Sequence, residues 1–186
     1  MLVGIISAFV AYYVIFYKSD AKIKGNDGER IVRKKLNQLN KSKYTVLNDV
    51  AFNIKGKISQ IDHVVVSDYG IFVIETKNYK GVIVGSDRSQ TWTQKIYKYK
   101  NQFYNPIKQN QGHIYALNYF LKERDLNAYQ SIIVFTDRGS LKVKSKTPVI
   151  YPSRLKKEIA SYRTVIYSRD TKSKIISTIE KYNINA

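Results

Sequence analysis

The hydrophobic and polar positions divide the chain into an apolar N-terminal run and a longer region of mixed pattern. The run LVGIISAFVAYYVIFY, which ends at Tyr17, carries no charged side chain. As a helix, sixteen residues extend about 24 Å, slightly less than the ~30 Å hydrocarbon core of a bilayer. Its tyrosines suit the membrane interface, and Lys18 can extend its ammonium to the headgroups. The pattern predicts an N-terminal transmembrane helix, a membrane anchor over residues 1–20, followed by one folded domain over residues 21–186.

The charges that flank the apolar run predict its orientation. No Lys or Arg precedes the run, whereas Lys18, Lys22 and Lys24 follow it. Because basic residues accumulate on the cytoplasmic side, we expect a single-pass protein of the cell membrane whose soluble domain faces the cytoplasm. Two other interpretations stay open. One is a cleavable signal peptide, which the small residues at Ser19 and Ala21 would suit, and the other is a buried helix of the domain.

The rest of the chain alternates between helical and extended periods. A helical pattern over residues 25–39 has Asn26 or Asp27 as its expected N-cap. Its inward stripe is Val32, Leu36 and Leu39. The strand-like runs are Tyr44–Phe52, Ile58–Ser67, Gly70–Lys77, Val82–Val84, Lys95–Tyr99 and Ser131–Thr136. With further helices expected from Pro106 to about Arg124 and near the C-terminus, from Lys172 to Tyr182, this order predicts an α/β domain. Helices flank its central mixed sheet.

Composition and charge indicate a folded protein that has a polyanionic partner. Of the 186 residues, 44% are hydrophobic and 13% aromatic, which indicates a folded chain. The 32 Lys and Arg against 14 Asp and Glu give a net charge of +18. This excess favours nucleic acid or an acidic membrane surface as partner, and a basic surface that only confers solubility remains an alternative. The absence of cysteine excludes disulfides and thiolate metal sites.

The stretch IDHVVVSDYGIFVIETK places carboxylates within two apolar strands. We expect Asp68 and Tyr69 to form a two-residue turn between these strands. Asp62 then lies directly opposite Glu75, with their Cβ atoms about 5 Å apart. Lys77 projects from the same face as Glu75, because strand side chains alternate. Three ionisable groups are therefore expected to meet at the open end of one hairpin.

Two opposed carboxylates repel each other and need a cation between them. Oxygen ligands suit a hard ion, Mg²⁺ or Mn²⁺, whereas two histidines and no cysteine make a zinc site difficult to assemble. A salt bridge in which Lys77 satisfies both acids is the alternative. Glu29, a third carboxylate on the stripe of the first helix, favours the metal site.

The order of these groups resembles the PD-(D/E)XK nuclease superfamily and, more specifically, the nuclease-related domain (NERD) family. The matching segments are GNDGERIV, LNDV, GKISQIDHVVVSDYGIFVIETKNYKG, the lone Trp92 and NPIKQNQGHIYAL. They occur in the family's order between Gly25 and Thr136. Ile61 stands where some superfamily members have a proline before the first acid. The resemblance implies a restriction-endonuclease-like fold and a metal-dependent nuclease.

The resemblance also implies residue roles. The candidate catalytic residues are Glu29, Asp62, Glu75, Lys77 and Gln109. Asp62 and Glu75 would bind the metal together with the Thr76 carbonyl. Lys77 would orient or help deprotonate the attacking water and stabilise charge on the phosphate. The glutamate of the first helix would support the metal or a bound water, and the glutamine of the second helix would contact the site.

Lysines interleaved with tyrosines in KIYKYKNQFY predict nucleic-acid contacts. As one strand, this segment would pair phosphate contacts with base stacking, although packed tyrosines and solvated lysines remain the alternative. His113, one helical turn after the site glutamine and on the same helix face, is a further candidate, either to support the site residues or to contact the substrate. The predicted nucleic-acid-binding residues are Lys95, Tyr97, Lys98, Tyr99, Lys100 and His113. We expect His63 to pack in the core, LKVKSK to form a solvated loop, and Trp92 to be either core or a substrate platform.

Three functions therefore compete. The first is a membrane-anchored, Mg²⁺-dependent nuclease, with DNA favoured over RNA as substrate. The second is a non-catalytic nucleic-acid-binding module that keeps the nuclease fold. The third is a scaffold on an anionic membrane surface.

Overall fold

The structure, a computed structural model, describes residues 25–185 except 124 and 137. The predicted membrane anchor, residues 1–20, lies outside this part of the chain. Among the described residues, no helix is long and apolar enough to cross a membrane.

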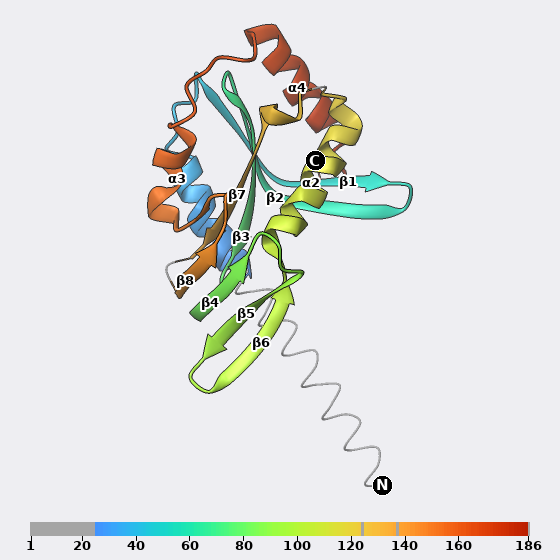
Figure 1. The fold of residues 1–186 in the computed structure, drawn as a ribbon. Coiled ribbons are helices and arrows are strands. Elements are labelled where there is room, and N and C mark those ends of the chain that lie inside the picture. Colours follow the sequence, from blue (N-terminus) through green and yellow to red (C-terminus); the bar gives the residue numbers. More distant parts are fainter. Residues whose placement is uncertain (1–24, 124, 137, 186) are drawn as a thin grey trace, which may run out of the picture.

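The described chain forms two β-sheets and four α-helices (Figure 1). The first sheet has the order β1 (Tyr44–Ile54), β2 (Lys57–Ser67), β3 (Gly70–Lys77), β7 (Tyr129–Phe135) and β9 (Val149–Ile150). The second has the order β6 (Tyr99–Tyr104), β5 (Thr91–Ile96), β4 (Gly81–Ser86) and β8 (Gly139–Lys144). The helices are a first helix described over residues 25–36, α2 (Pro106–Leu121), α3 (Pro152–Ile159) and α4 (Arg169–Tyr182), with a 3₁₀ turn at Leu126–Ala128.

Helices cover both faces of the first sheet. Strands β1, β2 and β3 are antiparallel, whereas β3, β7 and β9 run parallel, so the sheet is mixed. Val73 and its same-face neighbours pack against α2 and α4, while Phe72 and Ile74 pack against the first helix and α3. Burial on both faces explains the nearly continuous apolar sequence of β2 and β3. The predicted α/β domain with a mixed sheet and flanking helices is confirmed.

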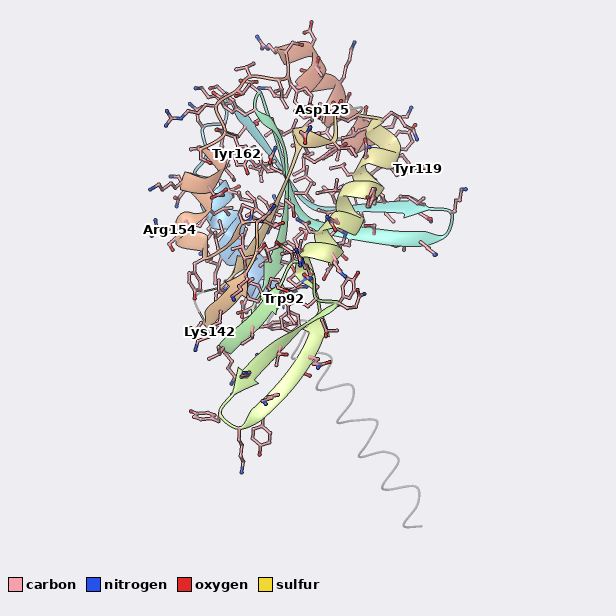
Figure 2. All side chains as sticks on the ribbon, viewed as in Figure 1. Trp92, Tyr119, Asp125, Lys142, Arg154 and Tyr162 are labelled. Atoms are coloured by element: carbon pink, nitrogen blue, oxygen red, sulfur yellow. The ribbon has the colours of Figure 1, made fainter. Side chains whose placement is uncertain are left out.

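Strands β3 and β7, which run parallel at the centre of the first sheet, lead into β4 and β8 of the second sheet. Beyond β3 and β7, the Thr136 amide donates to the Lys77 carbonyl at 3.0 Å, and the two segments then pair again as β4 and β8. Strands β5 and β6 form a hairpin that projects from the body of the molecule (Figure 1). Trp92, labelled in Figure 2, is fully buried where this sheet meets the start of α2, and its ring stacks on Phe135. Trp92 is therefore a core residue and not a substrate platform.

Two predictions about the bounds of elements are wrong. The backbone is already helical at Gly25, so Asn26 and Asp27 lie inside the first helix and neither is its N-cap. The single strand predicted over Lys95–Tyr99 is interrupted at Tyr97, whose positive φ of 52° belongs to the turn between β5 and β6. The alternating lysines and tyrosines therefore span a hairpin turn and do not share the two faces of one strand.

The sequence pattern also missed several elements. The segment LKVKSK was expected to be a loop, but most of it belongs to β8, which pairs with β4. The exposed lysines make this segment look like a loop in the sequence. The residues that alternate with them, Leu141 and Val143, pack on the core of the second sheet. Strands β6 and β9 and helix α3 were not predicted.

Candidate active site

The hairpin of β2 and β3 has the predicted register. Ser67 faces Gly70 across a two-residue turn, and the ladder continues to His63 opposite Ile74. Asp-Tyr is an unusual turn pair, and the flanking residues stabilise it. The Ser67 hydroxyl accepts from the Tyr69 amide at 3.0 Å, and Gly70 adopts a φ of 133°. This register brings Asp62 next to the strand position of Glu75.

Asp62 is held where β2 and β3 separate. Its Oδ2 accepts a hydrogen bond of 2.7 Å from the Thr76 amide, just past the last main-chain pair of the two strands. Burial, followed by repulsion from Glu75, raises the pKa of Asp62 well above its usual value. The side chain therefore replaces a main-chain acceptor and fixes one carboxylate at the end of β3.

Glu75 and Lys77 form a buried ion pair on the same face of β3. Lys77 Nζ lies 2.6 Å from Glu75 Oε1 and donates to Gln109 Oε1 at 3.0 Å. The Glu75 side chain is 2% exposed. Burial favours the neutral form of both groups, but His113 and then Lys77 stabilise the charged carboxylate, so the pKa of Glu75 is lowered, and Glu75 in turn raises the pKa of Lys77.

Helix α2 adds His113 to the site. Its Nε2 lies 3.2 Å from Glu75 Oε2, and its Nδ1 lies 3.0 Å from the Ser59 hydroxyl. Gln109 Nε2 lies 3.5 Å from the same imidazole. Of the two roles expected for His113, the structure favours support of the site, because the imidazole lies against the buried carboxylate of Glu75. It lies on α2, apart from the other five predicted nucleic-acid-binding residues, which belong to β5, β6 and their turn.

Glu29 reaches the rim of the site from the opposite face of the sheet. A Cβ atom at the neighbouring Gly28 would lie 2.9 Å from Asn78 Cβ, so the first helix packs closely on the ends of β3 and β7. Burial and the nearby Asp49 raise the pKa of Glu29, with a smaller contribution from Glu75. Within the described chain, no hydrogen bond or ion pair joins Glu29 to the other site residues. Its coupling to them is electrostatic.

The donor groups fit a hard divalent cation. In residues 25–185, with the two gaps noted above, no three His, Asp or Glu side chains are placed to hold one ion. The candidate ligands are two carboxylates, Asp62 and Glu75, and the carbonyl of Thr76. Glu75 Oε2 is buried, and its one polar neighbour in the described chain is His113 Nε2, at 3.2 Å. Carboxylate and carbonyl oxygens suit Mg²⁺ or Mn²⁺, and a cation would relieve the repulsion that raises the pKa of Asp62.

Two asparagines position α2, and the sequence pattern did not identify their roles. Asn105 caps the helix by accepting from the Ile107 amide, and its Nδ2 contacts the main-chain oxygens of Ser86, Asp87 and Ser89. The buried Asn110 donates to the Val73 carbonyl and the Ser131 hydroxyl, both at 2.8 Å. The Asn-Pro pair signals a helix start, but these long-range contacts have no local signal.

His63 lies in the core, as predicted. It is fully buried on the face opposite Asp62, and its Nδ1 lies 2.7 Å from Asn48 Oδ1. Burial, assisted by the Arg33 guanidinium, lowers the pKa of His63 to about 4. The imidazole is therefore neutral at physiological pH.

Comparison with known proteins gives two matches. The sequence pattern of the nuclease-related domain (NERD) family, within the general context of PD-(D/E)XK nucleases, matches residues 24–136. An uncharacterised protein of Bacillus anthracis is 37% identical over 185 residues, which cover 97% of this chain and 86% of that protein. No solved structure matches the chain significantly. The family match contains all the candidate catalytic residues.

Proposed function

Because the chain belongs to the nuclease-related domain family, we propose that it is a metal-dependent nuclease that hydrolyses phosphodiester bonds in nucleic acid, with DNA favoured over RNA. The observation that supports this most strongly is the Lys77 ammonium, 2.6 Å from Glu75 beside the anchored Asp62 carboxylate. Carboxylate oxygens and a charged ammonium at one sheet end match the needs of phosphoryl chemistry.

The site residues contribute through their charges and hydrogen bonds. A divalent ion at Asp62 and Glu75 would polarise the phosphodiester and lower the pKa of a bound water. Lys77 has a raised pKa and is therefore protonated at neutral pH, so its role is to stabilise negative charge on the phosphate. Gln109 accepts from this ammonium and fixes its direction. Glu29 lies at the rim of the site and has a raised pKa, so its carboxyl group is suited to hold or release a proton.

We extend the proposal to the membrane on the basis of sequence alone. The uncharged run within residues 1–20 and the lysines that follow it suit a single-pass anchor with the nuclease domain on the cytoplasmic side. The substrate would then be nucleic acid near the cytoplasmic face of the membrane.

The test of this function is cleavage of labelled DNA and RNA by the full chain, with Mg²⁺, with Mn²⁺ and with chelator. We expect metal-dependent cleavage that falls by at least about 100-fold in Glu75→Gln, because the charge that binds metal and pairs with Lys77 is lost. Glu180→Gln, at an exposed position on α4, is the matched control and should cleave normally.

The contradicting result is equal cleavage by Glu75→Gln and the control. If neither protein cleaves while both bind nucleic acid irrespective of Mg²⁺, the non-catalytic binding module replaces the nuclease.

A further inference from the structure

The outer face of the second sheet carries four lysines from three strands. Lys95 on β5 pairs with Lys100 on β6, while Lys142 and Lys144 on β8 pair with Val84 and Ser86 of β4. Strand β4 pairs Val82 with Lys95, so all four lysines share one face. On the opposite face, the core contains Ile83, Trp92, Phe103, Leu141 and Val143. We call the outer surface defined by Lys95, Lys100, Lys142 and Lys144 the lysine face; Lys142 is labelled in Figure 2.

The charge on the lysine face is not neutralised within the described chain. All four lysines are exposed, and strands β4, β5, β6 and β8 contain no Asp or Glu. Among the described residues, none of the four takes part in an ion pair. The carboxylate of Asp87, which follows β4, accepts instead from the Ser145 hydroxyl and the Lys146 amide.

The pairing of two lysines across β5 and β6 reduces the local stability of the second sheet. Lys95 and Lys100 lie directly opposite each other, and like charges at that position in an antiparallel pair are destabilising. A sheet that only needed solubility would gain from an acidic cross-strand partner at one of these sites. A polyanion bound to the lysine face would supply the negative charge that the second sheet itself lacks.

The other groups on the lysine face favour nucleic acid over a lipid surface. They are polar or hydroxyl-bearing, with only partly buried valines between them: Val82, Val84, Thr91, Thr93, Gln102, Tyr104 and Ser140. Hydroxyl and amide groups bond to phosphate and sugar, and a tyrosine at the edge can stack on a base. Tyr104 is the one exposed large hydrophobic side chain on the lysine face, whereas a face that inserts into a membrane would present several.

We propose that the lysine face binds the sugar–phosphate backbone of nucleic acid without sequence preference. It lies on the continuation of the catalytic strands, since β4 begins four residues after Lys77 and β8 follows β7. Its use for holding substrate rests on the proposed nuclease function, whereas binding itself requires no cleavage. The tip of the adjoining hairpin, where Tyr97 is 100% exposed, extends the surface beyond the lysines.

The test measures binding in chelator, so that hydrolysis plays no part. The full chain in neutral detergent is titrated against a fluorescent DNA duplex and single strand at several salt concentrations. The first variant replaces Lys95, Lys100, Lys142 and Lys144 by Gln. The matched control makes the same change at four exposed lysines elsewhere: Lys57, Lys156, Lys157 and Lys174. Both variants lose the same charge, and circular dichroism and thermal unfolding check their folds.

We expect the lysine-face variant to lose at least about tenfold in DNA affinity near 0.1 M salt, with the slope of log K against log salt reduced by about 3. The control should retain most of the wild-type affinity. Equal affinities for variant and wild type, or equal losses in both variants, would overturn the inference.

A parallel assay with phosphatidylcholine vesicles, with and without phosphatidylserine, tests whether the lysine face binds anionic lipid and not nucleic acid. If the lysine-face variant loses only its phosphatidylserine-dependent binding, the surface serves the membrane and the inference is wrong. If the wild type binds DNA through these lysines but never cleaves it, the inference stands and the proposed function fails.

Discussion

Glu75 shows how single contacts determine the chemistry of the site. Its carboxylate is nearly inaccessible to solvent, yet the Lys77 ammonium and His113 keep its pKa below the usual value. Asp62 lacks such a cationic partner in the described chain, and burial and Glu75 raise its pKa. Two neighbouring carboxylates with opposite pKa shifts are a common feature of functional sites.

Gln109 is a positioning residue in this account. Gln109→Ala removes an acceptor of the Lys77 ammonium, so we expect the rate constant for cleavage to fall about 10- to 100-fold with little change in KM. Gln111→Ala, at an exposed position on the same helix, is the control. Equal kinetics for the two variants would show that Lys77 needs no such support.

His63 predicts a pH-dependent loss of stability. Its pKa is about 4 in the folded protein against 6.5 for a free imidazole, so the unfolded chain binds the extra proton between these values. The free energy of unfolding should therefore decrease as pH falls from 6.5 to 4, with a contribution of roughly 3 kcal/mol from this residue. Urea unfolding of wild type and His63→Gln at pH 7 and pH 4 measures it. Identical pH dependence in both proteins would contradict the assignment.

At the scale of elements, the apolar strands and the hairpin of β2 and β3 were predictable, whereas the second sheet was largely not. Nearly continuous apolar runs identify β2 and β3, and the two-residue turn expected at Asp68 and Tyr69 predicts their register. The edge strands β6 and β8 carry lysines and amides on their exposed faces, so their sequences resemble loops. Tyr97 at the hairpin turn has no turn-forming chemistry of its own, and its positive φ comes from the pairing of β5 with β6.

The site itself was predictable only where its residues are close in sequence. Asp62, Glu75 and Lys77 follow from one hairpin, and the family resemblance added Gln109. The contact between His113 and Glu75 and the anchoring of α2 by Asn110 join segments more than 30 residues apart. No local pattern encodes such distances.

The close approach of the first helix to β3 can be tested with two glycines. Gly28→Ala places a methyl group within 2.9 Å of Asn78 Cβ, so we expect a loss of about 1–3 kcal/mol in unfolding free energy and lower activity as Glu29 shifts. Gly112→Ala on α2 meets no atom within 4 Å and should stabilise the protein by about 0.5–1 kcal/mol. Thermal unfolding compares them, and equal effects of the two substitutions would contradict the packing.

Across the whole molecule, charge is divided between a small acidic site and a basic exterior. The net charge of +18 comes from 32 Lys and Arg against 14 Asp and Glu, whereas the candidate site places the buried Glu75 and the partly buried Asp62 near the junction of the two sheets. A positive exterior attracts polyanionic substrates over distances of about a Debye length, ~8–10 Å at physiological salt. In the proposed function, the acids at the junction would repel a phosphate unless a cation accompanied them, and metal binding would then be coupled to substrate binding.

The proposed anchor is a property of the whole chain. We expect the full chain to fractionate with membranes and to resist extraction by high salt, whereas the chain from Ala21 onward is released, because residues 1–20 supply the apolar contact. Immunodetection in membrane and soluble fractions measures this. Membrane retention of the shorter chain that salt reverses would assign the association to surface charge instead.

The most direct test of the central claim, a divalent ion held by Asp62 and Glu75, is Mn²⁺ binding followed by electron paramagnetic resonance. The full chain should bind Mn²⁺, Mg²⁺ should compete, and Asp62→Asn or Glu75→Gln should each weaken binding by at least about tenfold. Asp170→Asn, at an exposed position on α4, should bind like the wild type. Unchanged Mn²⁺ affinity in both site variants would contradict the claim, and the two carboxylates would then serve only to pair with Lys77.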